Sequence, residues 1–375
     1  MSLSWEKPIP IDLSELEGRR FTCIDPCQLC CLCQPELLEG EVPYFRRHFP
    51  ERIVAKKSPH RHFALALKQG GGPCTFLEGG RCSIYASRPH YCRQFPFHVH
   101  LSTRVQIELD LSCRGVWINQ GEEAVPLGMQ LVEENREVLT RGLRESAAVY
   151  EQLYANCREA NIDPYPDELR LEVADSLLLF SDPRYLTKVL DLSLEDEEMS
   201  LPQKEEGDLD LDGLRRASMD CSLESLSAPD LLSSPVYCDE QGRWKLFMSQ
   251  GKELDMYGMK EDGSTERIRT IMPEQVPFQA PEGAAAKMFC DYLALLNRRD
   301  SFLGNAYYLI DEYGYEDPLA NVYYGSLATS ALDLMWRTSL LAFVKGAKLD
   351  VSGVREGIIF YDMDRLDAPT IGAFM

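Results

Sequence analysis

The chain has 375 residues, and 45% of them are hydrophobic, which is enough for a sizeable core and for two or three domains. Its formal net charge is −21. This charge argues against general binding to nucleic acid or to an anionic membrane, because phosphate groups must be neutralised by Lys and Arg.

The first residues, MSLSWEKPIPIDL, show neither the basic start nor the apolar run of a signal peptide. The most apolar later stretch, SALDLMWRTSLLAFV, contains Asp333 and Arg337 and is too short to span a bilayer. We therefore expect a cytoplasmic protein with no membrane span.

After an extended lead-in over residues 1–20, nine cysteines follow in a spacing that no apolar core requires. Thiolate sulfur is a soft ligand that selects zinc, copper(I) or iron-sulfur clusters, whereas disulfides are rare in the cytosol. The pattern predicts one metal site or a pair. The predicted metal ligands are Cys23, Cys27, Cys30, Cys31, Cys33, Cys74, Cys82, Cys92 and Cys113.

Short elements are expected to deliver these cysteines. HFALAL, from His62 to Leu67, reads as a strand, and EGGRCSIY reads as a tight hairpin that carries Cys82. SRP begins a turn or short helix that brings Cys92 back, and Phe95 and Phe97 would cap the centre. The alternation from Val105 to Leu111 predicts a half-buried strand that leads to Cys113.

Positive charge is concentrated in the same region. From Pro43 to Arg104 there are eleven Lys and Arg against two acidic residues, and all six histidines lie in this window. Cations beside a thiolate centre lower thiol pKa values and raise a reduction potential. A basic docking patch for an acidic partner, or for a phosphate- or carboxylate-bearing substrate, is the alternative. The residues predicted to surround the metal ligands without binding the metal are Arg81, Arg88, His90, Arg93, His98 and Arg114.

The motif Cys27-x-x-Cys30-Cys31, followed by PCTFL, RCSIY, SRPHYCRQFPF and Cys113, resembles the YkgJ-type cysteine-cluster family over about residues 21–116. The resemblance implies a domain that chelates zinc or iron. Family members usually have Gly where this chain has Leu29, and Cys33 is additional. Both departures affect the exact ligand set.

The rest of the chain predicts helices and hairpins. From Leu127 to Cys157 an apolar stripe, which includes Val138 and Val149, indicates a long amphipathic helix with Cys157 in the core. LEDEEMSLPQKEEGDLDLDG reads as an acidic linker or mobile loop. Hairpins should turn at 240–242 and at 262–263, and helices should follow, with Cys238 and Cys290 in the core.

We therefore predict an α+β protein with four parts. These are a cysteine-cluster metal-binding domain at 1–120, a helical segment at 121–194, the acidic linker at 195–232, and an α+β domain with short hairpins at 233–375.

Three functions compete at this point. The first is an iron-sulfur protein with one or two clusters that transfers electrons, or serves a redox or maturation assembly, with a protein partner. The second is a structural zinc protein, since zinc also takes four thiolates. The third is a cluster-dependent protein lysine methyltransferase, a class to which the family resemblance extends more distantly. Cys23, Cys27 and Cys30 match the spacing of radical enzymes, but the alternating strands and helices of their usual barrel are missing from this sequence.

Overall fold

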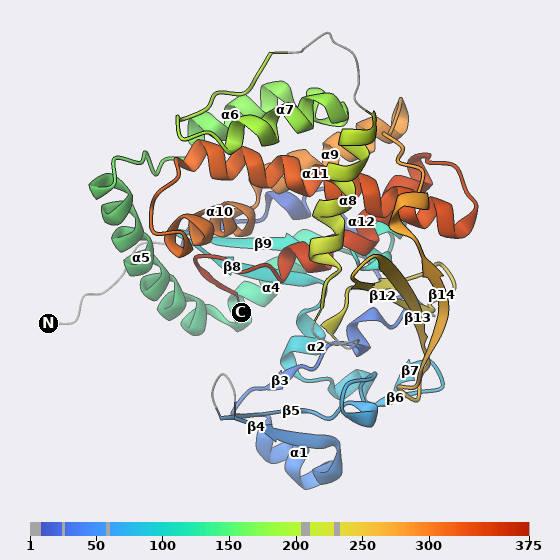
Figure 1. The fold of residues 1–375 in the computed structure, drawn as a ribbon. Coiled ribbons are helices and arrows are strands. Elements are labelled where there is room, and N and C mark those ends of the chain that lie inside the picture. The colour runs from blue at the N-terminus through green and yellow to red at the C-terminus, as the bar shows by residue number, and fades with distance from the viewer. Residues whose placement is uncertain (1–8, 25–26, 58–60, 204–210, 229–232, 375) are drawn as a thin grey trace, which may run out of the picture.

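The computed structural model describes residues 9–24, 27–57, 61–203, 211–228 and 233–374. It has the predicted α+β class. In Figure 1 the cysteine-rich part lies at one end of the molecule, and most of the helices lie towards the other end or along the side. Helices α6 (Asp167–Ser176), α7 (Pro183–Ser193) and α11 (Leu319–Lys345) lie in the upper part of that view. Helix α1 (Val42–His48) and the small sheet of residues 36–65 lie at the bottom.

The cysteine-rich part contains small elements. Strands β3 (Glu36–Leu37), β5 (His62–Leu65) and β4 (Ile53–Lys56) form an antiparallel sheet in that order. Helix α1 (Val42–His48) packs Phe45 into the core beneath it. The hairpin predicted around Cys82 is confirmed as β6 (Leu77–Glu78) and β7 (Arg81–Cys82), and α2 (His90–Gln94) carries Cys92.

A second sheet joins the two ends of the chain. Its order is β1 (Ile11–Asp12), β9 (Val105–Leu109), β8 (Phe97–Leu101) and β15 (Ala373–Phe374), with β1 parallel to β9. Strand β2 (Arg20–Phe21) pairs with β10 (Glu122–Glu123). The prediction of a half-buried strand at Val105–Leu111 is wrong, because β9 is buried on both faces. Its polar residues Gln106 and Glu108 accept hydrogen bonds from Asp300 and Ser301.

The predicted long helix is divided at Asn135. Helix α3 (Arg114–Ile118) precedes α4 (Ala124–Glu134) and α5 (Arg136–Glu159), and α6 (Asp167–Ser176) and α7 (Pro183–Ser193) follow. Cys157 is buried as predicted, but Val138 and Val149 are exposed. The buried stripe of α5 instead runs at helical spacing through Leu139, Ser146, Tyr150, Leu153 and Cys157.

The predicted linker contains a helix within its described residues. Helix α8 (Leu211–Ser225) packs against α11, and its Ser222 hydroxyl donates to Asp333 at 2.6 Å. Residues 204–210 and 229–232 of this stretch lie outside the described residues.

Both predicted hairpins are confirmed in one antiparallel sheet. Its strands are β11 (Val236–Cys238), β12 (Trp244–Gln250), β13 (Glu253–Met259) and β14 (Thr265–Ile271), in chain order. Short 3-10 turns occur elsewhere, at Ser14–Leu16, Leu29–Cys31, Pro50–Arg52, Lys68–Gly70, Tyr85–Ser87, Leu179–Ser181 and Pro273–Gln275.

Four helices complete the fold: α9 (Ala284–Arg298), α10 (Asp300–Glu312), α11 (Leu319–Lys345) and α12 (Val351–Leu366). Helix α11 contains the apolar stretch SALDLMWRTSLLAFV, and its buried Arg337 pairs with Asp333 at 2.9 Å. The largest apolar core is built from residues spread along the sequence, from Leu16 to Tyr361. No helix among the described residues is long and apolar enough to cross a membrane.

Candidate metal centre

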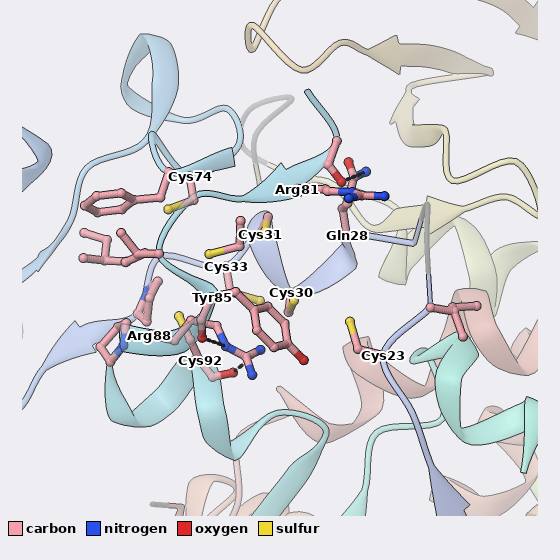
Figure 2. A pocket seen from close by; sticks show the side chains of 18 residues that line it. Cys23, Gln28, Cys30, Cys31, Cys33, Cys74, Arg81, Tyr85, Arg88 and Cys92 are labelled. Atoms are coloured by element: carbon pink, nitrogen blue, oxygen red, sulfur yellow. Dashed lines mark hydrogen bonds between the residues drawn. The ribbon is translucent and has the colours of Figure 1, made fainter. Parts of the chain in front are cut away.

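Seven of the nine predicted ligands surround one cavity of about 320 Å³, which we call the thiol cavity. Figure 2 shows the cysteines that line this cavity, with Tyr85, Arg81 and Arg88 beside them. Cys23 and Cys33 are exposed, so the cavity is open to solvent. The seven are Cys23, Cys30, Cys31, Cys33, Cys74, Cys82 and Cys92.

A tight turn places the first cysteines. Gln28 adopts a left-handed conformation with φ of 54°, and the 3-10 turn Leu29–Cys31 follows directly. The turn is held from two sides: the Gln28 side-chain amide donates to the Gly80 carbonyl at 2.6 Å, and the Cys74 amide donates to the Cys31 carbonyl at 2.7 Å. These two bonds fasten the early cysteine run to the segments that carry Cys74 and Cys82.

The C-terminal sheet braces the hairpin that carries Cys82. Glu261, in the turn between β13 and β14, accepts hydrogen bonds from the amides of Gly79 and Gly80, both at 2.8 Å. Lys68 donates to the Leu77 carbonyl at 2.5 Å and to the Glu261 carbonyl at 2.9 Å. The geometry of the thiol cavity therefore depends on residues of the second half of the chain.

Cys27 and Cys113, the other two predicted ligands, are buried outside the described lining of the thiol cavity, and Cys238 joins them. The Cys238 thiol donates to the Cys27 carbonyl at 3.2 Å. Interaction with the Cys238 thiol lowers the pKa of Cys27 to about 6, and the pKa of Cys238 rises correspondingly. Sequence reasoning assigned Cys238 to the sheet core and missed this contact, since spacing carries no information about so distant a pairing.

Burial is the main influence on the pKa values of three thiols in the cavity. It raises the pKa of Cys74, Cys82 and Cys92, and the positive charge of Arg88 opposes this effect on Cys82 and Cys92. These thiols are therefore protonated in the absence of a metal, and a metal would have to displace their protons.

The six residues predicted to surround the metal ligands divide into two groups. Arg81 and Arg88 line the thiol cavity, and Arg88 lies 3.8 Å from the ring centre of Tyr85 and donates to the Cys92 carbonyl at 3.5 Å. Arg114 lies instead beside the buried cysteines Cys27 and Cys238. It donates to the Cys238 carbonyl at 2.7 Å and pairs with Glu356 at 2.5 Å.

The remaining three are absent from the described lining of the thiol cavity. The His90 amide donates to Glu41 at 2.8 Å, and Arg93 lies 4.0 Å from the same carboxylate. His98 faces a neighbouring cavity with Phe95 and Phe97. Phe95 and Phe97, which were expected to cap the metal centre, are absent from the described lining of the thiol cavity and line this second cavity instead.

Within the described part of the chain, no three His, Cys, Asp or Glu side chains form a ready-made site for a single metal ion. The thiols surround a space instead of converging on one point. The donor set is nevertheless that of a soft-metal site, since seven sulfurs line the cavity. These residues therefore fit a zinc ion or an iron-sulfur cluster in the kind of ligand they offer.

Clustered thiols on short elements, held by a cationic and aromatic surround, define a cysteine-cluster metal-chelating domain. Residues 22–114 match the CxxCxxCC family model, described as a "putative zinc- or iron-chelating domain". The match covers about a quarter of the chain and confirms the resemblance drawn from the motif. No curated protein and no solved structure matches the chain.

Proposed function

We propose that the thiol cavity holds an iron-sulfur cluster that transfers electrons to a protein partner or serves a redox or maturation assembly. One observation carries the proposal: seven cysteines surround a single space of about 320 Å³. A single zinc ion needs four thiolates and little volume, whereas a cluster needs a chamber with sulfur ligands on several sides.

The surroundings support the same assignment. A bound cluster would supply reversible electron transfer. Arg81 and Arg88 would stabilise the additional negative charge of its reduced form, and the exposed Cys23 and Cys33 mark the side from which a redox partner can approach.

Zinc is the second candidate, and one observation favours it. Cys31, Cys82 and Cys92 pack against the core cluster that contains Cys74, and all four line the thiol cavity. Four thiolates complete a tetrahedral zinc site that serves only to hold the fold.

Metal analysis separates the two candidates. The protein is purified without oxygen, and iron, zinc and acid-labile sulfide are measured per chain. Iron together with sulfide in stoichiometric amounts supports the cluster. Zinc alone, without sulfide, overturns it.

Substitution then tests the cavity. Cys92→Ala removes a sulfur from the thiol cavity and is expected to lower the bound metal several-fold, with loss of any visible absorption band. Cys290→Ala is the matched control, because this thiol is buried against the Leu177 carbonyl, at 3.3 Å from it. Equal metal content in both variants would remove Cys92 from the site.

A further inference from the structure

A second cavity, of about 450 Å³, lies between the cysteine-rich part and helix α12, and we call it the α12 cavity. It shares Cys30, Cys33 and Cys92 with the thiol cavity, so the two are neighbours. Met363 and Leu366 of α12 close it from the C-terminal half. A molecule bound there would lie beside the cysteines.

Asp110 is the polar group that this cavity leaves unsatisfied. Its side chain is 1% exposed. One carboxylate oxygen, Oδ1, accepts a hydrogen bond from the Ser112 amide at 2.8 Å. The other, Oδ2, is buried and has no hydrogen-bond partner among the described residues. A buried carboxylate oxygen is costly to leave unpaired, so a donor at this position would be stabilised strongly.

The charge of the lining favours a cation as that donor. The described lining residues include two carboxyl groups, Asp110 and Asp367, and neither Lys nor Arg. Burial raises the pKa of Asp110 to about 7 and that of Asp367 to about 6, and a cation bound beside them would favour their charged forms. His98 Nε2 lies 3.9 Å from Asp110 Oδ2. Burial, together with the nearby positive charge of Arg299, lowers the pKa of His98 to about 4, so its ring is neutral near pH 7 and does not replace the missing cation.

The rest of the lining is apolar and aromatic. Phe95, Phe97 and Leu366 offer surface to a short hydrocarbon chain, and Tyr91 adds a further ring. Aromatic faces also attract an ammonium group. Apolar walls with few convergent polar groups are typical of small-molecule sites.

We propose that the α12 cavity binds a small primary amine in its ammonium form. An ammonium N–H donates to Asp110 Oδ2, the exposed Asp367 adds negative charge at the solvent side, and the hydrocarbon part lies against Phe95, Phe97 and Leu366. The ammonium group must carry an N–H, which excludes a quaternary ammonium ion, and a primary ammonium group offers three such donors. The binding site stands on these contacts whichever metal occupies the thiol cavity.

Calorimetric titration of the anaerobically purified full chain tests the proposal. The probes are n-butylamine, n-butyrate and tetramethylammonium. Butylamine is expected to bind at least about tenfold more tightly than either of the others, because only it brings both a positive charge and an N–H donor. Equal binding of butyrate, or no binding of butylamine, would overturn the assignment.

Two variants locate the binding. Asp110→Asn keeps the size of the side chain, removes its charge, and is expected to weaken butylamine binding at least about tenfold. Met363→Lys places a tethered ammonium at the cavity wall and should abolish binding even if Asp110→Asn fails to fold. Glu133→Gln, which neutralises an exposed carboxylate elsewhere, is the control.

Metal content is measured on every sample. Unchanged metal with no amine binding would overturn this inference and leave the proposed function intact. Amine binding that Asp110→Asn and Met363→Lys leave unchanged would also overturn it, because the amine would then bind somewhere else.

Discussion

Buried polar side chains on β9 anchor the start of α10. Gln106 accepts a hydrogen bond from the Asp300 amide at 2.5 Å, and Glu108 accepts two from Ser301, at 3.1 and 2.6 Å. A carboxylate at a helix N-terminus satisfies amides that have no partner within the helix. The polar face of this strand is therefore a helix-binding surface, although its alternating pattern resembles that of a strand facing water.

Glu108 is expected to make stability depend on pH. Burial raises its pKa from 4.5 to about 7. Between these values the unfolded chain releases a proton that the folded chain keeps, so the contribution of Glu108 to the free energy of unfolding falls as pH rises, by about 3 kcal/mol in all. Glu108→Gln removes this pH-dependent contribution to the free energy of unfolding. Urea unfolding at about pH 5 and about pH 8 should show a smaller loss in the variant, and identical losses would contradict the prediction.

The burial of single residues was predicted correctly where the pattern of neighbouring residues determines it. Cys157 lies on a helical stripe, and Cys290 lies on a predicted helix, so both were correctly assigned to the core. Cys238 is also buried in the core of the C-terminal sheet as predicted, but the contact of its thiol with the carbonyl of Cys27, 211 residues away, was missed. Asp110 was missed as well, because its unpaired oxygen is a property of the folded surroundings.

At the scale of elements, the hairpin β6–β7 is held largely from outside. It has two residues in each strand, and Glu261 and Lys68 supply hydrogen bonds to its backbone. A hairpin of this size is not stable alone. The position of Cys82 therefore depends on the β13–β14 turn.

Removal of the Glu261 side chain should loosen this hairpin. We expect Glu261→Ala to speed hydrogen exchange of the Gly79 and Gly80 amides and to lower metal affinity about 10- to 100-fold, as loss of an outer support commonly does. Exchange is followed by mass spectrometry, and affinity by chelator competition. Glu266→Ala is the control, because Glu266 pairs only loosely with the exposed Lys260, at 3.7 Å. Equal protection in both variants would contradict the bracing role.

Helices and hairpins whose own residues define them could be predicted from the sequence. Turn residues at 240–242 and 262–263 identified both C-terminal hairpins. Helix α12 was not predicted as a helix, and its charged residues explain why. Glu356 and Asp362 are buried because Arg114 and Arg299 pair with them from far along the chain. No pattern within α12 itself reveals those partners.

Across the whole molecule, Arg299 connects three distant segments. Its buried guanidinium lies 2.8 Å from Glu15 and 2.7 Å from Asp362, and it donates to the Leu109 carbonyl at 2.7 Å. These contacts join the lead-in, β9 and α12. The same segments contribute to the large core, which draws on both ends of the chain.

Arg299→Met is expected to lower the free energy of unfolding by about 3–5 kcal/mol, because it leaves two carboxylates buried without their partner. Lys287→Met, which breaks an exposed pair with Asp291, should cost less than about 1 kcal/mol. Chemical denaturation of both variants checks this difference. A loss for Arg299→Met as small as that of the control would show that the network is not needed for stability.

Metal removal should destabilise the cysteine-rich end of the molecule and leave the helical end folded. The core under the cysteine-rich sheet contains six buried residues, one of them Cys74, whereas the large core spans most helices. So small a core needs a metal or another cross-link to remain folded. Treatment with a strong chelator is therefore expected to expose the amides of β3 to β7 to hydrogen exchange while α9, α10 and α11 stay protected. Simultaneous loss of protection in both regions would mean that they fold as one cooperative unit, and unchanged protection in β3 to β7 would mean that metal does not support this part.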